Sequence, residues 1–397
     1  MPGARRALRE LSDAIVRAAR DVRVLRSLAW DRSVHRDFLA KGARQLPRPR
    51  YAPLEFDLDD KLREVRAIRL RLRGRNPVEE LLRRSVENLV ITCRMLAARG
   101  TRAFYRHSVE LYGDPRDGYA RAASVENLAI ARYWVSRPKG TVERATLSAE
   151  QCKGRIEAIV RPVLGDGCRV RLSRRIAAYA AAGARSIALR SDARFTPRQA
   201  RALAHHEGLW HVLTAMNGRA QPVLTVLGTG LAFHTESQEG GGIVSEYLTG
   251  NLSNDRFAEL GERTLAIDRA ARGADYLTVW RSLAERFGEA RACHLAERVF
   301  RGGVLTGGAP FTKDAVYQRG YCRVFDFLRT ALDKGDDAVV LAFFAGKLSI
   351  DDASTVRDLM HEGLVRAPAF QPAWWRDKGR LAALVTHSVT LNQFQMH

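Results

Sequence analysis

Apolar residues recur at helical spacing along most of the chain, which predicts a mainly helical protein. The N-terminal helices predicted in this way lie at residues 5–45 (one or two helices), 57–73 and 77–98. Asn76 and Pro77 supply a cap and a first-turn proline for the last of these helices. Residues 46–53 contain three prolines and are predicted to form an extended linker, because proline disfavours helix at the residue before it.

Two short stretches alternate between apolar and polar residues and predict strands instead. They are residues 168–172 and 186–190, of which the second directly precedes a long helical run. Helical spacing returns afterwards and predicts helices within residues 255–300, from 312 to 328, and as short segments in 335–397. The pattern as a whole therefore predicts an α+β fold, mainly α, with a small sheet and accessory helices.

Capping residues mark two helices in the middle of the chain. Thr196 and Gln199 have the spacing of a capping box and predict the start of the first helix. Asn217-Gly218 is predicted to end it in the left-handed conformation. A second helix is predicted to begin around Gln238 and to end before Gly250.

The composition narrows the class of protein. The 397 residues are enough for a full core and two or three subdomains. The sequence has no run of about 18 apolar residues, so it predicts no membrane span. Residues 1–30 lack the pattern of a secretory signal. The five cysteines are scattered without a C-x-x-C pair, so neither a disulfide framework nor a thiolate zinc site is indicated. A cytoplasmic location is therefore expected.

The net charge of +21 is compatible with a protein that binds acidic partners. Of the 65 basic residues 57 are arginines, and residues 1–100 contain 24 basic and 13 acidic residues. Such a surface attracts acidic proteins and nucleic acid. In residues 62–70, however, the arginines alternate with apolar residues at helical spacing, as on an ordinary solvated helix face. A basic scaffold is therefore an alternative function, with nucleic acid the less expected partner.

The candidate chemistry begins with His206-Glu207-x-x-x-His211 on the first of the two capped helices. In the usual H-E-x-x-H signature the histidines are four residues apart and share one helix face. Five residues in an ideal helix leave two side chains roughly 140° apart, which forbids chelation. A π-helical turn makes residues five apart into neighbours. Gly208 lowers helix propensity within the interval and favours such a distortion.

A zinc ion held by two histidines needs a third protein ligand and an open position for water. Glu239 is the best candidate, 28 residues after His211 at the start of the second helix. Glu246 lies two turns further along the same face and is placed to orient a histidine. Glu207, next to a ligand, is suited to take a proton from the bound water. One zinc per chain is therefore expected, although a histidine pair in the protein core remains an alternative interpretation.

Two further histidines lie close by in the sequence. His205 is not expected to share the metal of His206, because adjacent residues of a helix point apart. His234 is a candidate donor to the transition state, and the alternative is a solvated loop histidine.

Several motifs in a fixed order resemble the QEGLA-motif family, whose bacterial members carry the label flavohaemoglobin expression-modulating protein. The relatives of that family in animals include the microtubule-associated tyrosine carboxypeptidase. The motifs are residues 192–196, the histidine motif at 206–211, Asn217-Gly218, Gln221-Pro222, Gln238-Glu239-Gly240, and the segments 104–115 and 311–320. The resemblance covers roughly residues 100 to 330.

The resemblance implies a zinc metallopeptidase that removes a C-terminal residue from a peptide or protein. It implies metal ligands at His206, His211 and Glu239 and a catalytic base at Glu207. The predicted organisation is then a basic helical accessory region (1–100), a zincin-like metallopeptidase domain (101–330) and a C-terminal helical region packed on that core (331–397). An acidic substrate would match the charge of the chain.

The motifs also depart from the family pattern. Trp210 precedes His211, and Gly241-Gly242 stands where the family has Leu-Ala. Consecutive glycines each weaken a helix by up to about 1 kcal/mol. The departures point to a looser site or to a different substrate pocket, so tyrosine specificity does not carry over. A catalytically weak, metal-binding regulatory protein is the alternative.

A carboxypeptidase also needs a cation for the terminal carboxylate of its substrate and a donor for the developing oxyanion. Lys313, Tyr317 and Arg319 lie in the downstream motif and are the candidates. For each of them, the alternative is an ordinary position on a helix surface or in the core. The strand predicted at residues 186–190 suggests a sheet edge that binds an extended peptide.

Overall fold

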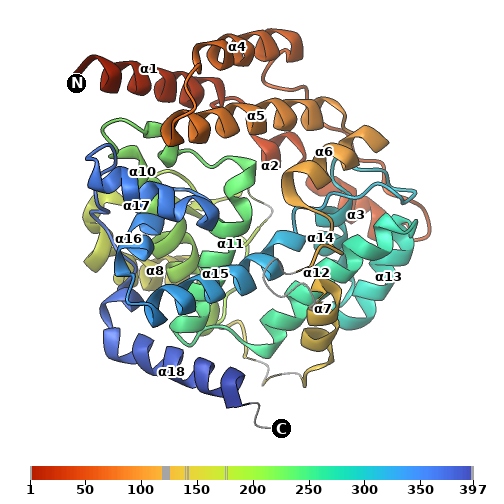
Figure 1. Cartoon of the computed structure of the whole chain (residues 1–397). Helices are drawn as coiled ribbons and strands as arrows, with labels where there is room; N and C mark the ends of the chain where they lie inside the picture. The colour runs from red at the N-terminus through yellow and green to blue at the C-terminus, as the bar shows by residue number, and fades with distance from the viewer. Residues whose placement is uncertain are drawn as a thin grey trace.

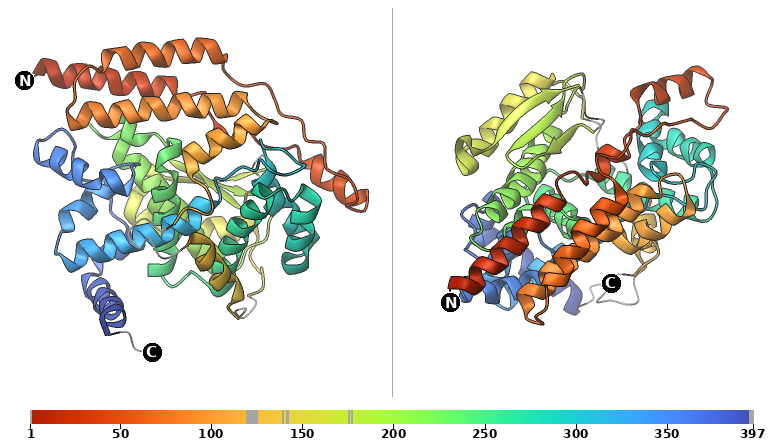
Figure 2. Two further views of the ribbon diagram at one scale, coloured as in Figure 1. Left: turned by 45° about the vertical axis from the view of Figure 1, so that its right-hand side comes forward. Right: turned by 90° about the horizontal axis from the view of Figure 1, so that it is seen from above.

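The computed structural model describes residues 2–118, 126–138, 140, 143–174, 176 and 178–394. Over these residues the protein consists mostly of helices, with one three-stranded sheet (Figures 1 and 2). The predicted fold class, α+β and mainly α with a small sheet, is therefore confirmed. The last residues of the predicted C-terminal region, 395–397, lie outside the described part.

A layer of helices forms one side of the molecule. The helices of the N-terminal part are α1 (Pro2–Ala18), α2 (Val24–Ser27), α3 (Arg32–Ala40), α4 (Leu58–Arg71), α5 (Pro77–Ala97) and α6 (Arg102–Tyr112). Helices α1, α4 and α5 pack against one another along the top of Figure 1. The helices predicted at residues 57–73 and 77–98 are confirmed by α4 and α5, and residues 46–53 form neither helix nor strand.

Side-chain caps explain where two of these helices begin. The Asn76 side chain accepts a hydrogen bond from the backbone N–H of Glu79 and starts α5 with Pro77 in its first turn. The Asp31 side chain accepts one from Ser33 and starts α3. Residues 5–45 consequently form three helices rather than one or two.

The sheet is small and lies beside α8 (Ala149–Leu164), which follows α7 (Asn127–Ser136). Its strands are β1 (Arg169–Ser173), β2 (Ala180–Ala182) and β3 (Ser186–Arg190), in the order β1-β3-β2. Strand β3 pairs parallel to β1 and antiparallel to β2. The two strands expected at residues 168–172 and 186–190 are confirmed. Strand β2 was not predicted, because a run of three alanines has no alternating pattern.

The central helical run contains a π-helical segment. Helix α9 (Pro197–Leu203) continues through the π-helix η2 (Ala204–Val212) into α10 (Leu213–Arg219). At its start, Thr196 and Gln199 form the predicted capping box. The predicted left-handed end at Asn217-Gly218 is wrong, since the helix runs on to Arg219 and Gly218 has no positive φ.

Packing explains the Asn217-Gly218 pair instead. A Cβ on Gly218 would lie 2.0 Å from the carbonyl oxygen of Leu227, so only glycine fits at this crossing. The Asn217 side chain donates hydrogen bonds to the carbonyl oxygens of Phe344 and Phe370 at 2.9 and 2.8 Å. These two residues therefore join the central helix to the C-terminal segments.

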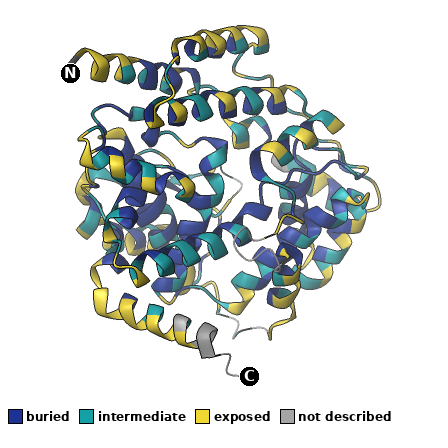
Figure 3. Ribbon diagram, in the orientation of Figure 1, coloured by how far each residue is buried: buried dark blue, intermediate teal, exposed yellow. Residues whose placement is uncertain are grey.

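The second helix of the middle region is α11 (Thr235–Leu248), which lies in the interior of the molecule (Figure 3). It ends before Gly250 as predicted but begins three residues earlier than expected. Its neighbours α15 (Ala315–Asp333) and η2 make extensive contacts with it. The short helices η3 (Thr225–Gly228) and η4 (Ala232–His234) connect it to α10.

The remaining helices enclose this centre. They are α12 (Asn254–Ala271), α13 (Tyr276–Phe287), α14 (Glu289–Phe300), α16 (Asp337–Phe344), α17 (Ala353–His361) and α18 (Lys378–Phe394), with short turns at η1 (Gly165–Gly167), η5 (Ile350–Asp352) and η6 (Ala373–Arg376). Helix α18 carries the C-terminus and is largely exposed (Figure 3). In the described part of the chain, no helix is both long and apolar enough to cross a membrane.

Hydrophobic packing joins distant parts of the chain. One cluster combines Leu11 and Ile15 of α1 with Trp210 of η2 and with Phe343 and Phe344 of α16. Another cluster lies between the sheet, α8 and the start of the central helix. The division into regions 1–100, 101–330 and 331–397 stays a prediction.

Candidate active site

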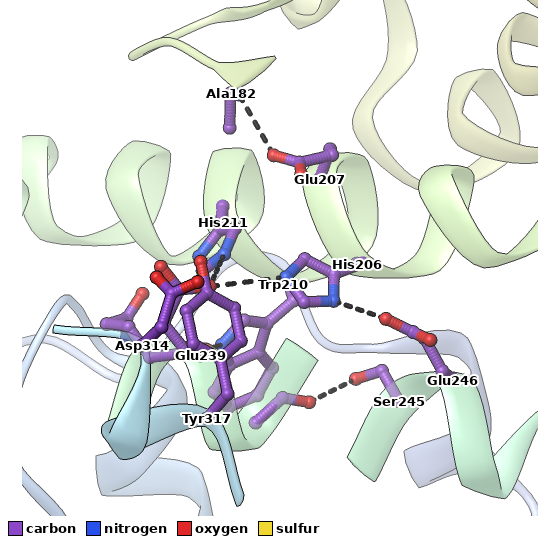
Figure 4. A network of polar contacts seen from close by, with 12 residues as sticks. Ala182, His206, Glu207, Trp210, His211, Glu239, Ser245, Glu246, Asp314 and Tyr317 are labelled. Atoms are coloured by element: carbon purple, nitrogen blue, oxygen red, sulfur yellow. Dashed lines mark hydrogen bonds and ion pairs between the residues drawn. The ribbon is translucent and has the colours of Figure 1, made fainter. Parts of the chain in front are cut away.

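The π-helix brings the two histidines of the H-E-x-x-x-H motif together. The rings of His206 and His211 have centroids 4.9 Å apart and meet edge to face at 70° (Figure 4). In η2, the backbone hydrogen bonds join residues five apart in place of four, so side chains five residues apart lie close together. Gly208 faces α8, where a Cβ would lie 2.6 Å from Val160 Cγ2. The glycine therefore permits close packing behind the histidines.

Glu239 of α11 completes the group. Its Oε2 lies 3.5 Å from His206 Nε2 and 3.6 Å from His211 Nε2. The three ligand atoms all lie within 4.8 Å of one another. Both histidines are buried, and the Glu239 side chain is only 15% exposed. Two imidazole nitrogens and one carboxylate that converge in this way form a donor set of the kind that holds catalytic zinc.

A second carboxylate orients the first histidine. His206 Nδ1 donates to Glu246 Oε1 at 2.7 Å, which turns its Nε2 toward Glu239. Arg256 lies 3.5 Å from the other oxygen of Glu246 and balances its buried charge. By contrast, His211 Nδ1 is buried without a hydrogen bond in the described part of the structure.

The charges around the group set the protonation of its three side chains in the absence of a cation. Burial raises the pKa of Glu239, but nearby Lys313 and the hydrogen bonds of the two histidines outweigh it and hold that pKa well below its usual value. Burial lowers the pKa of His211. For His206, burial also lowers the pKa, yet Glu239 and Glu246 raise it well above its usual value when no cation lies between them. The site therefore binds positive charge strongly.

Glu207 follows His206 directly in the π-helix, and its carboxylate reaches the sheet. Its Oε2 accepts a hydrogen bond from the backbone N–H of Ala182 in β2 at 2.9 Å (Figure 4). Gly183 N–H and the carbonyl of Tyr179 bond to β3. Because backbone groups alternate along a strand, the N–H of Ala182 faces the free edge of the sheet. Glu207 thus connects the histidine helix to an open strand edge.

The three substrate-binding candidates are placed differently from one another. Lys313 Nζ donates to Glu239 Oε1 at 2.9 Å and lies 3.4 Å from the hydroxyl of Tyr317, so these two residues border the histidine group. Arg319 forms an ion pair with Glu236 and donates to the carbonyl of Tyr112. None of its described contacts reaches the histidine group, so the structure does not bring Arg319 into the site.

His234 is buried in η4, so the alternative of a solvated loop histidine is wrong, and its role as a donor stays a prediction. Its ring lies 3.8 Å from that of Phe233, and its Nδ1 has no hydrogen bond within the described structure. Burial, with the nearby charge of Lys347, lowers the pKa of His234 to about 3. The imidazole is therefore neutral at physiological pH.

Lys347 borders the site and was not predicted from the sequence. It follows α16, its ammonium interacts electrostatically with Glu239 and Glu207, and burial lowers its pKa to about 8. The described part of the structure contains no hydrogen bond or ion pair of its side chain. The rarity of lysine in this chain was the signal that could have identified Lys347 from the sequence. Only 8 of the 65 basic residues are lysines, and two of those, Lys313 and Lys347, border this site.

The glycines of α11 explain the departures in its motif. A Cβ on Gly241 would lie 2.0 Å from Trp210 Cζ2, and one on Gly242 would lie 2.6 Å from His206 Cε1. The Trp210 indole also donates to the carbonyl of Gln238 at 2.7 Å. The tryptophan and the glycines thus fit each other, and the helix forms without interruption. The glycines therefore have a reason in packing, which the sequence pattern alone did not show.

A family model described as microtubule-associated tyrosine carboxypeptidase matches residues 36–393. No curated protein matches the chain significantly. Among solved structures, a candidate lipoprotein from Colwellia psychrerythraea aligns at 12% identity with a TM-score of 0.36, over 84% of this chain and 64% of its own. That likeness is too low to support a conclusion about fold or function.

Proposed function

Because this chain belongs to the microtubule-associated tyrosine carboxypeptidase family, we propose that it is a zinc-dependent carboxypeptidase with a zincin-like core. The observation that carries the proposal is the convergence of two imidazole Nε2 atoms and the Glu239 carboxylate. The substrate would be the C-terminus of a peptide or protein. The name of this family specifies tyrosine, but Trp210 and the glycines depart from its motif, so the preferred C-terminal residue is left to experiment.

His206, His211 and Glu239 would hold the metal, with Glu246 fixing the orientation of His206. Bound zinc would supply Lewis-acid chemistry, polarising a carbonyl and making a water more acidic. The chain itself contributes the orientation of the ligands and their burial. Both are in place in the structure, because η2 and α11 pack directly against each other.

The free edge of β2 offers a binding place for the substrate backbone. The N–H of Ala182 points away from β3 and toward the carboxylate of Glu207. An extended peptide that adds to this edge would accept the hydrogen bond from Ala182 in place of Glu207. Substrate binding would then release a carboxylate oxygen of Glu207 next to the scissile bond.

Glu207 is the proposed catalytic residue. Once released from Ala182, its carboxylate would take a proton from the attacking water and pass it to the nitrogen of the leaving amine. Lys313 and the hydroxyl of Tyr317 lie beside Glu239, where they can donate hydrogen bonds to a developing oxyanion. Lys347, whose ammonium has no described side-chain partner, is the proposed cation for the terminal carboxylate of the substrate.

The test combines metal content with hydrolysis of a panel of peptides that differ in the C-terminal residue. We expect about one zinc per chain at this site, lost in His211→Ala. Glu207→Gln keeps the shape of the side chain and should retain the zinc. Its turnover should fall by about 10²–10⁴-fold, as expected for the loss of a general base. Unchanged turnover would exclude the role of Glu207.

The same measurements separate the alternatives. Zinc without hydrolysis of any peptide would favour a metal-binding regulatory protein. No zinc at this site and salt-dependent binding to acidic peptides or DNA would favour a basic scaffold. Neither outcome agrees with the proposed carboxypeptidase.

A further inference from the structure

A second group of metal-binding side chains lies outside the candidate active site. His35 of α3 and two residues of α14, His294 and Glu297, place one ligand atom each within 4.8 Å of one another. His294 and Glu297 are three residues apart and share a helix face. His35 reaches them from a helix more than 250 positions earlier in the chain. The three side chains therefore meet only because α3 packs on α14.

The contacts within this group leave donor atoms unsatisfied. His35 Nε2 lies 3.1 Å from Glu297 Oε2, but the atom is buried and has no well-aligned hydrogen bond in the described structure. The rings of His35 and His294 meet edge to face with centroids 4.8 Å apart. A simple histidine–carboxylate hydrogen bond would align the pair and would not require the second imidazole.

The protonation states also suit a cation. Burial raises the pKa of Glu297, but the nearby imidazole of His35 and the charge of Arg301 outweigh it, so the pKa is lowered and the carboxylate is ionised. Burial lowers the pKa of His294 to about 4, which keeps its imidazole neutral. One oxygen of Glu297 also accepts a hydrogen bond from the N–H of Trp30 at 3.4 Å, which helps to fix the carboxylate.

We propose that His35, His294 and Glu297 bind a second zinc ion, which connects α3 to α14. Two imidazoles and one carboxylate are a regular donor set for zinc, with the fourth position left for water or another small ligand. Around an ion with bonds of about 2.0–2.1 Å, the ligand atoms would draw in to roughly 3.3 Å from one another. None of the three residues takes part in the proposed peptide hydrolysis, so the role of this ion is structural.

One of the three residues borders a pocket. His294 also lines a pocket of about 420 Å³ together with Tyr179, Arg190 and Arg291. The guanidinium groups of Arg190 and Arg291 lie near enough to lower the pKa of His294 further, so they also oppose a cation. An anionic fourth ligand, such as chloride or phosphate, would offset that repulsion.

The test removes the first site and measures what remains. In a His206→Ala/His211→Ala background, elemental analysis after equilibration with zinc should find about one ion per chain. Adding His294→Ala should abolish this binding. Adding His361→Ala, which changes an exposed histidine of α17, should leave it intact. In the same background, zinc should raise the Tm, and His294→Ala should remove that shift.

A second measurement covers the case in which the double variant does not fold. Glu297→Gln in the otherwise unchanged chain preserves the shape of the side chain and should lower the zinc content by one ion per chain. The proposal is overturned if the background variant folds and binds no zinc, or if its zinc content is the same after His294→Ala. It is equally overturned if Glu297→Gln leaves the zinc content of the unchanged chain as it was.

Discussion

At the scale of single residues, the two glutamates on either side of the histidines have separate tasks. Glu246 accepts a hydrogen bond from Nδ1 of His206. Glu207 instead accepts one from a backbone N–H at the edge of the sheet. Both carboxylates are near the candidate ligands in space, yet only the first acts on the geometry of a ligand. The contacts therefore divide metal binding from proton transfer and allow each to be tested alone.

Glu246→Gln should weaken zinc binding and leave the fold in place. The variant keeps an oxygen that can accept from His206 but loses the charge that makes the imidazole a better ligand. Loss of such a supporting carboxylate typically costs about 10–100-fold in metal affinity. Competition with a fluorescent chelator measures the change, and Glu362→Gln at an exposed position serves as the control. Equal affinities for the two variants would argue against the orienting role.

Lys347→Ala should act on the substrate and not on the metal. A hydrogen bond to a charged group contributes about 1.5–3 kcal/mol, so kcat/KM for peptides with a free C-terminus should fall by about 10–100-fold. Lys334→Ala, at an exposed lysine, is the matched control. Peptides with an amidated C-terminus should be cleaved equally slowly by both variants. An equal kcat/KM of the two variants on free peptides would exclude Lys347 as the carboxylate-binding cation.

At the scale of elements, the pairing of Trp210 with the glycines of α11 sets the distance between two helices. The indole lies where side chains of ordinary size on α11 would be. Helix α11 also meets α15 at Gly240, where a Cβ would lie 2.2 Å from the carbonyl oxygen of Gly320. The glycine run lets α11 approach both neighbours, which brings Glu239 and Glu246 to the histidines.

Gly241→Ala should therefore destabilise the protein despite the higher helix propensity of alanine. Overpacking of this kind costs about 1–3 kcal/mol. Gly154→Ala in α8 is the control, since its Cβ would meet nothing within 4 Å; it should be neutral or stabilising by up to about 1 kcal/mol. Urea denaturation measures both free energies of unfolding. If Gly241→Ala is no less stable than Gly154→Ala, the packing argument is wrong.

At the scale of the whole molecule, buried histidines make stability depend on pH. The pKa of His234 falls from 6.5 to about 3 on folding, because the imidazole is buried near the charge of Lys347. Between these two values the unfolded chain binds more protons than the folded chain. Stability contributed by His234 is therefore present above pH 6.5 and is lost as the pH falls, by up to about 1.4 kcal/mol per pH unit.

His234→Gln should flatten this dependence. Urea denaturation of the metal-free protein at pH 7 and pH 5 should show a smaller loss of stability for the variant than for the unchanged chain. His361→Gln, at an exposed site, should keep the full dependence. A pH dependence of His234→Gln equal to that of the unchanged chain would contradict the assignment.

The part of the structure that the sequence determined by itself is local. The helices at residues 57–73 and 77–98, the capping box at Thr196 and the strands of β1 and β3 follow from periodicity and side-chain caps. The need for a π-helical turn followed from the five-residue spacing of the histidines, because helix geometry alone relates spacing to direction. These signals act within about one turn or one strand, so the sequence of a short segment is enough to predict them.

Only the tertiary structure decided which distant side chains meet. The packing of whole elements determines three features of the site: the contact of Glu207 with Ala182, the position of Lys347, and the distance of Arg319 from the histidine group. The same holds for His35, which contacts α14 although the two are separated by most of the sequence. Such contacts follow from the burial of apolar surface shared by many residues, and no local pattern specifies them. For this reason the composition of the proposed zinc site could be predicted, while its surroundings could not.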